Sequence, residues 1–124
     1  MSFQLQMEQM SGYLAARFVG VSVRGEGSRQ FELIAERCKR THNNKLLIDI
    51  TRHEYEVGEQ ISLMDRFFFG ERLEIFARYG IKVAFFSRPE QLDPRRFALV
   101  VAQNRGVKLE SFTDLQAAEE WLLK

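Results

Sequence analysis

Short apolar runs alternate with helical patterns along most of this chain. The clearest run, residues 45–51, is almost wholly apolar between Lys45 and Thr51. A continuous apolar run of this length is typical of a strand buried on both faces, and helices between such strands are the crossovers of a parallel sheet. We therefore expect residues 45–51 to lie inside a sheet, with a paired strand on each side.

The same patterns predict the other elements. Two extended segments in residues 3–23 meet at Ser11-Gly12, which predicts an opening hairpin. Apolar positions at helical spacing then alternate with apolar runs in the order ββαβαβαβα. The predicted helices are 28–42, 57–79 (bent or divided at Gly70), 93–105 and 113–122, and the later strands are 81–87 and 107–112. This order predicts one α/β domain over residues 1–124, with a mixed sheet of four to five strands and about four helices.

Composition narrows the classes of protein. The 124 residues are 45% hydrophobic, and 18 Lys and Arg balance 17 Asp and Glu to a net charge of +1, so no overall field favours nucleic acid or a membrane surface. Cys38 is the single cysteine, which excludes an intramolecular disulfide and favours a reducing compartment. No leader pattern and no run of about 18 apolar residues is present, so we expect a cytoplasmic protein without a transmembrane segment. Two distant histidines predict neither a metal site nor a cofactor.

Three segments resemble the STAS superfamily, and within it the SpoIIAA-like proteins related to anti-anti-sigma factors. They are the Leu-Leu-Ile-Asp-Ile-Thr strand at 46–51, the strand at 80–86 after a long helix, and the ending 112–122 with its Ala-Ala-x-x-Trp-Leu pattern. The resemblance implies a mixed sheet with helices mainly on one side and a non-enzymatic regulatory or ligand-binding role. It also implies that Asp49, near the end of its strand, holds the adjacent loop.

One departure from the family concerns its switch. Anti-anti-sigma factors carry Asp-Ser-x-Gly where the helix after the central strand begins, and a kinase modifies that serine. Here the corresponding place holds Glu56-Val57-Gly58-Glu59, which has no hydroxyl group. The sequence therefore does not indicate a phosphoserine switch.

Candidate binding residues gather where parallel strands end. Loops after parallel strands meet at one edge of a sheet, which is where ligands of α/β proteins bind. Nearby glutamates partly cancel the positive potential of the arginines at this edge, so we expect an anion to bind only weakly. A plainer interpretation of His53 is a solvated histidine in a loop, and a plainer interpretation of Thr51 is an ordinary threonine in a strand. The candidates are Arg24, Thr51, Arg52, His53 and Arg88.

Phe67, Phe68 and Phe69 form a second candidate site. Adjacent helical residues point about 100° apart, so the three rings cannot all face one core. At least one ring is then exposed at an interface or packed under a neighbouring loop. We predict a symmetric homodimer that uses part of helix 57–79.

The sequence is compatible with three candidate functions. A non-enzymatic regulatory domain with a protein partner is the first, and a binding protein for a small anionic ligand or lipid is the alternative. A pocket of about 300 Å³ or more favours the alternative. An enzyme is the third, and it requires a carboxylate within hydrogen-bond reach of His53.

Overall fold

The computed structural model describes residues 3–58 and 60–124 and contains one five-stranded sheet. Its strands lie in sequence order, with β1 and β2 antiparallel and the other neighbours parallel. The strands are β1 Phe3–Gln9, β2 Leu14–Ser22, β3 Lys45–Tyr55, β4 Lys82–Phe86 and β5 Leu109–Phe112. The helices are α1 Phe31–Arg40, α2 Leu63–Arg72, α3 Glu74–Arg78, α4 Phe97–Asn104 and α5 Leu115–Leu122, with short 3-10 turns at Ser28–Gln30 (η1) and Pro89–Gln91 (η2). The predicted α/β class, the mixed sheet and the opening hairpin are confirmed.

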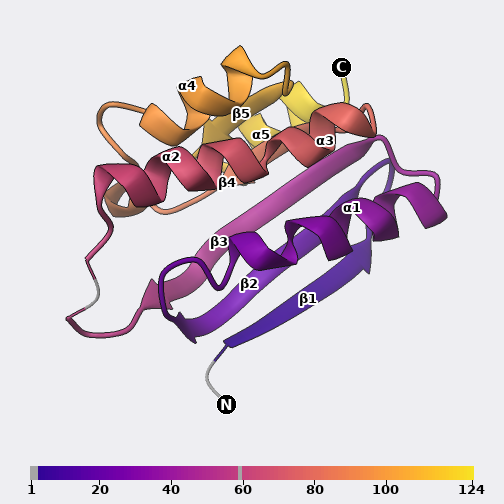
Figure 1. Cartoon of the computed structure of the whole chain (residues 1–124). Helices are drawn as coiled ribbons and strands as arrows, with labels where there is room; N and C mark the ends of the chain where they lie inside the picture. Colours follow the sequence, from indigo (N-terminus) through magenta and orange to yellow (C-terminus); the bar gives the residue numbers. More distant parts are fainter. Residues whose placement is uncertain (1–2, 59) are drawn as a thin grey trace.

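The central position of residues 45–51 is also confirmed, because β3 pairs with β2 on one side and with β4 on the other. Leu46 and Ile48 point into a large core on the face covered by α1, α3 and α4, whereas Leu47 packs into a smaller core under α5. Figure 1 shows the first four helices in front of the sheet and α5 behind it. The alternation along β3 therefore explains why nearly every residue of this run is apolar.

The structure corrects the helix predicted at 57–79 in two ways. The helix predicted at 57–79 begins only at Leu63, and it is divided at Leu73 into α2 and α3 rather than at Gly70. Gly70 instead lies where α2 crosses α4, and a Cβ atom on it would be 2.5 Å from the carbonyl oxygen of Ala98. The glycine allows the two helices to approach closely.

Candidate functional site: a groove beneath helix α2

A groove of about 800 Å³ lies at the carboxyl edge of the sheet. Four neighbouring strands contribute apolar side chains to it, and α2 contributes residues of one helical face. The apolar strand residues are Phe18, Ile50, Phe85 and Leu109, and the α2 residues are Asp65, Arg66, Phe68, Phe69 and Arg72. We call this the edge groove, and its volume lies within the range of ligand-binding sites.

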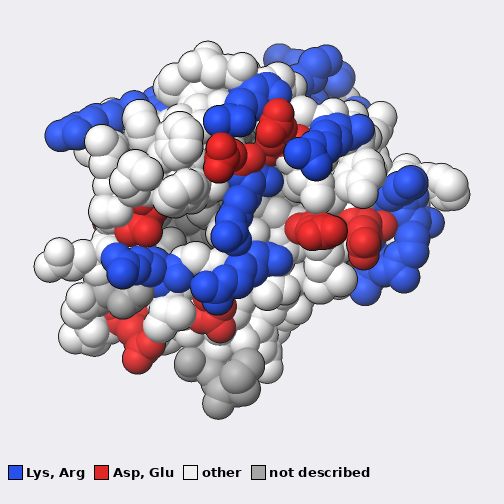
Figure 2. Space-filling view, in the orientation of Figure 1, with Lys and Arg blue, Asp and Glu red and all other residues white. Residues whose placement is uncertain are grey.

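Arginines dominate the rim of the edge groove. Of the described lining residues, six are arginines and four are acidic: Arg24, Arg29, Arg66, Arg72, Arg88 and Arg96 against Glu54, Asp65, Glu90 and Asp93. Figure 2 shows basic side chains around a hollow between α2 and the start of α1, with acidic groups interspersed. The groove thus combines apolar walls with a rim that favours a negative group.

The structure brings three of the five predicted edge residues into this groove. Arg24, His53 and Arg88 line it, whereas Thr51 and Arg52 do not. The reason is a β-bulge in β3, since Arg17 pairs with Asp49 but Val19 pairs with Arg52. The extra residue reverses the alternation of side chains, which directs His53 to the groove face and leaves Arg52 exposed on the other.

Asp49 stabilises this bulge. One of its carboxylate oxygens accepts hydrogen bonds from the backbone N–H of Thr51 at 2.8 Å and from the Thr51 hydroxyl at 2.6 Å. Asp49 therefore has the structural role that the resemblance implies. The Thr51 hydroxyl is bonded inside the strand rather than directed at a ligand.

His53 was predicted in a solvated loop, and that prediction is wrong. β3 continues to Tyr55 because the long strand β2 pairs with it to that point, and His53 is only 8% exposed. Its Nε2 shares a hydrogen bond of 2.6 Å with the Ser22 hydroxyl. Burial lowers the pKa of His53; Arg88 lowers it further, whereas Glu26 and Glu54 oppose the shift.

The Ser22–His53 pair does not meet the condition set for an enzyme. Ser22 is only 2% exposed, so its hydroxyl is closed to a substrate. Among the described residues, no carboxylate is hydrogen-bonded to the imidazole. The pair joins β2 to β3 at the wall of the groove.

We predict that stability falls as the pH drops below about 6.5, the ordinary pKa of histidine. The folded protein resists protonation of His53 more than the unfolded chain does, so the contribution of neutral His53 is present above that pH and is lost as the pH falls through the lowered pKa. Urea unfolding between pH 5 and 8 measures this slope. His53→Gln should flatten it, and Ser22→Ala, which keeps the imidazole, should retain most of it; equal slopes in all three proteins would contradict the assignment.

Arg88 lies at the predicted edge but has structural partners. Its guanidinium donates to the carbonyl oxygen of Thr51 and forms ion pairs with Glu54 at 3.4 Å and with Glu90 at 2.8 Å. The sequence predicted Arg88 only as a candidate binding residue. The structure instead makes it part of the support of β3.

The three phenylalanines of α2 point in different directions. Phe69 packs against Phe31 and Phe85, Phe67 lies beneath the guanidinium of Arg105, and Phe68 is 47% exposed beside the groove. At least one exposed ring was expected, and Phe68 is that ring. The homodimer stays a prediction, and light scattering at high micromolar concentration tests it.

The helix after the central strand begins later than the sequence predicted, and its first residues include a hydroxyl group. Residue 59, part of the segment expected at the helix start, lies outside the described residues. The N-cap of α2 is Ser62, whose hydroxyl accepts from the N–H of Asp65 at 3.1 Å and donates to its carboxylate at 2.8 Å. A hydroxyl group therefore does stand at the start of the helix that follows the central strand, contrary to the prediction.

Sequence reasoning missed Arg29, Arg72 and Ser87 in the edge groove. Arg72 had an available signal, because its spacing from Phe68 and Phe69 places it on the side of α2 that faces the groove. Ser87 follows Val83 and Phe85 at alternate positions of the predicted strand 81–87, and this spacing predicts that all three side chains face the same side. The Ser87 Oγ is the one buried side-chain polar atom without a hydrogen-bond partner in the described part of the chain.

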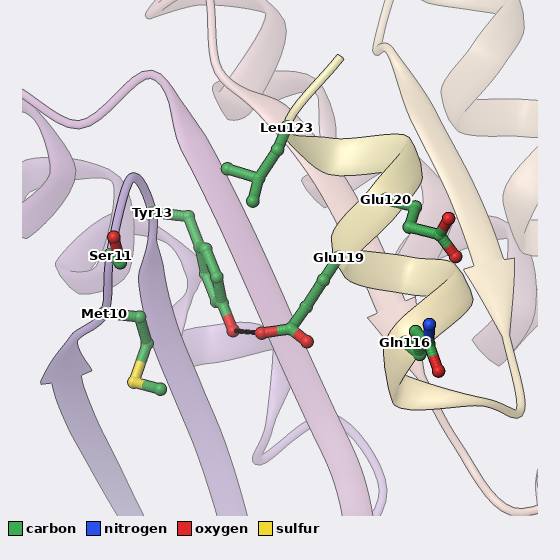
Figure 3. A pocket seen from close by; sticks show the side chains of 7 residues that line it. All are labelled: Met10, Ser11, Tyr13, Gln116, Glu119, Glu120 and Leu123. Carbon is green, nitrogen blue, oxygen red and sulfur yellow. Dashed lines mark hydrogen bonds between the residues drawn. The ribbon is translucent and has the colours of Figure 1, made fainter.

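A second cavity, of about 330 Å³, lies between the β1–β2 hairpin and α5. Met10, Ser11 and Tyr13 line one side, and Gln116, Glu119, Glu120 and Leu123 line the other (Figure 3). The Tyr13 hydroxyl donates to Glu119 at 2.6 Å across it. Burial, followed by the hydrogen bond to Glu119, raises the pKa of Tyr13 to about 12.

We predict that Tyr13→Phe lowers the free energy of unfolding at pH 7 by about 1.5–3 kcal/mol, the usual range for a hydrogen bond to a charged group. The wild type should also lose stability above pH 10, because the unfolded tyrosine ionises there while the folded one stays protonated to about pH 12. Denaturant unfolding at pH 7, 9 and 10.5 measures both effects. Tyr79→Phe, at an exposed tyrosine, is the control; an equal loss in both variants would contradict the role of the Tyr13–Glu119 bond.

No cluster of three or more His, Cys, Asp or Glu side chains in residues 3–58 and 60–124 is placed to hold a metal ion. None of the helices in this part of the chain has the length and apolar character needed to cross a bilayer.

Comparison with solved structures identifies the class of fold. This chain is similar to an uncharacterised protein with a SpoIIAA-like fold from Shewanella loihica. The aligned region covers 98% of this chain and 94% of that protein, with 20% identity and a TM-score of 0.53. For an anti-sigma factor antagonist from Mycobacterium paratuberculosis, the aligned region covers 99% of this chain and 96% of that protein, with 14% identity and a TM-score of 0.58. For the phosphorylated form of the Bacillus cell-fate determinant SpoIIAA, the aligned region covers 95% of this chain and 99% of that protein, with 9% identity and a TM-score of 0.53.

The chain therefore has the SpoIIAA-like fold that the sequence resemblance implied. No protein-family model matches the sequence, and no curated protein matches it. At identities of 9–20% the likeness concerns the fold.

Proposed function

We propose that this protein is a non-enzymatic binding domain that holds a small amphiphilic anion in the edge groove. The supporting observation is the groove itself, about 800 Å³ of space with apolar walls and an arginine-rich rim. A buried hydroxyl without a partner is costly unless a ligand or water satisfies it, and the Ser87 Oγ at the groove is such a group. The sequence offered a binding protein for a small anionic ligand or lipid as the alternative to a regulatory domain. A pocket of about 300 Å³ or more favours that alternative, and the groove is larger than this.

Binding of 1-anilinonaphthalene-8-sulfonate, an aromatic sulfonate, tests this proposal. We expect saturable one-to-one fluorescence enhancement, competition by dodecanoate and no competition by dodecylammonium. Ser87→Leu should occupy part of the groove, remove the unbonded hydroxyl and abolish binding while the protein stays folded. Ser11→Leu, in the second cavity, is the matched control; equal binding by both variants, or competition by the cation, would overturn the proposal.

The second candidate function is a regulatory domain with a protein partner. It is supported by the fold shared with anti-sigma factor antagonists and by the hydroxyl of Ser62 at the start of α2. Phosphate at a helix N-terminus is favourable, but here it would displace the Asp65 carboxylate that holds Ser62 and would repel it. Capture of partners from the native cells with wild type, Ser62→Ala and Ser62→Glu tests this candidate, because only a Ser62 switch makes the captured partner depend on that residue.

The location in the cytoplasm stays a prediction, supported by the single cysteine.

A further inference from the structure

The arginines around the edge groove differ in their partners. Arg66 pairs with Asp93 at 2.9 Å, Arg96 pairs with Glu110, and Arg88 pairs with two glutamates. In the described chain, no carboxylate lies within ion-pair distance of Arg29 or Arg72. The positive charge that remains uncompensated is therefore at the end of the groove formed by η1 and the last turn of α2.

Arg29 and Arg72 approach the same segment of chain. Arg72 Nη1 is 3.4 Å from the hydroxyl of Ser28, and that hydroxyl donates to the carbonyl of Gly25 at 3.2 Å. Arg29 Nη2 comes within 3.8 Å of the position that a Cβ on Gly25 would take. Two guanidinium groups thus flank one short turn, where each can donate to an oxyanion.

The groove continues away from these arginines as an apolar passage across the sheet. Its walls pass from Phe18 on β2 to Phe85 on β4 and then to Leu109 on β5 beneath α2. Ser87 faces this passage with its unpartnered hydroxyl, and the half-buried Ser111 lines it on β5. The passage accommodates an elongated apolar body whose head stays at the two arginines.

We propose that the ligand is a single-chain amphiphile with one acidic head group, bound head-first by Arg29 and Arg72, with its chain directed beneath α2 toward Ser111. This inference rests on the proposed function and adds the class of the ligand and its direction. A carboxylate and a phosphate monoester share the required chemistry, because both accept two hydrogen bonds from a guanidinium.

The test measures the affinities of decanoate, decyl phosphate, decanol and decylammonium by isothermal titration calorimetry. Arg29→Gln and Arg72→Gln should each weaken both anions about ten-fold or more through the lost charge-assisted hydrogen bonds, and should leave decanol unchanged. Arg52→Gln, on the opposite face of β3, should bind all four probes as the wild type does. A larger loss for decyl phosphate than for decanoate identifies a phosphate head, and the reverse identifies a carboxylate.

The direction of the chain is tested by Ser111→Phe and a series of fatty acids. In the wild type each added methylene should raise affinity about four-fold until the groove is filled. Ser111→Phe should leave hexanoate unchanged and stop the increase at a shorter chain. Loss of hexanoate binding in Ser111→Phe, or wild-type binding of anions by both arginine variants, would overturn this inference and leave the proposed function standing; a wild type that binds no amphiphile would overturn both.

Discussion

Replacing Gly70 with alanine is expected to lower the free energy of unfolding by about 1–3 kcal/mol, the usual cost of an extra methyl group in a packed interface. The new Cβ would lie 2.5 Å from the carbonyl oxygen of Ala98 and 2.8 Å from Cβ of Val101. A backbone oxygen cannot rotate away as a side chain can, so α2 and α4 have to separate. The expected loss outweighs the gain of about 1 kcal/mol that alanine has over glycine inside a helix.

Gly80→Ala is the matched control, because a Cβ there meets nothing within 4 Å and only its positive φ of 66° adds strain. We expect its cost to stay near 1–2 kcal/mol, the penalty of the left-handed conformation. Urea unfolding with circular dichroism detection measures both. Gly70→Ala should also alter amphiphile binding, since α2 roofs the groove, whereas Gly80→Ala should not. A Gly70→Ala protein as stable as the wild type would show that the α2–α4 contact is looser than the structure describes.

The sequence predicted the strands well because their signal is local. A run of apolar residues such as 45–51 specifies a buried strand wherever it is placed, and the structure confirms it between two neighbours. The last residues of β3 were missed because their polar character indicated a loop. The alternation Arg52-His53-Glu54-Tyr55 was the available signal, and it indicates a strand with one polar face.

The site was only partly predictable, because it depends on two features without a local signal. The β-bulge decides that His53 rather than Arg52 faces the groove, and it follows from the way in which β2 and β3 pair. The groove itself depends on the position of α2, which approaches α4 closely at Gly70. Sequence pattern placed Arg24 and Arg88 at this edge, but it did not separate cations with acidic partners from those without.

On the side where β4 ends, the last residues of β3 are supported by a side chain of η2. The β3–β4 ladder ends at Asp49 and Phe86. The side-chain amide of Gln91 then donates to the carbonyl oxygens of Ile50 at 2.7 Å and His53 at 3.0 Å, while its oxygen accepts from the backbone N–H of Arg88 at 2.7 Å. One glutamine in η2 thus replaces the missing strand and fixes the bulge that directs His53 to the groove.

Gln91→Ala is expected to lower the free energy of unfolding by about 2–4 kcal/mol, because three partly buried hydrogen bonds, each contributing about 0.5–1.5 kcal/mol, are lost together. Gln103→Ala is the matched control, since Gln103 donates a single bond of 2.9 Å to the carbonyl of Leu109 on β5, and its loss should cost about 1 kcal/mol. Hydrogen exchange followed by mass spectrometry should show faster exchange in residues 50–55 of Gln91→Ala alone, together with weaker anion binding in the groove. Equal stability losses in the two variants, with exchange in 50–55 unchanged, would show that the bulge holds without Gln91 and that Asp49 is sufficient to form it.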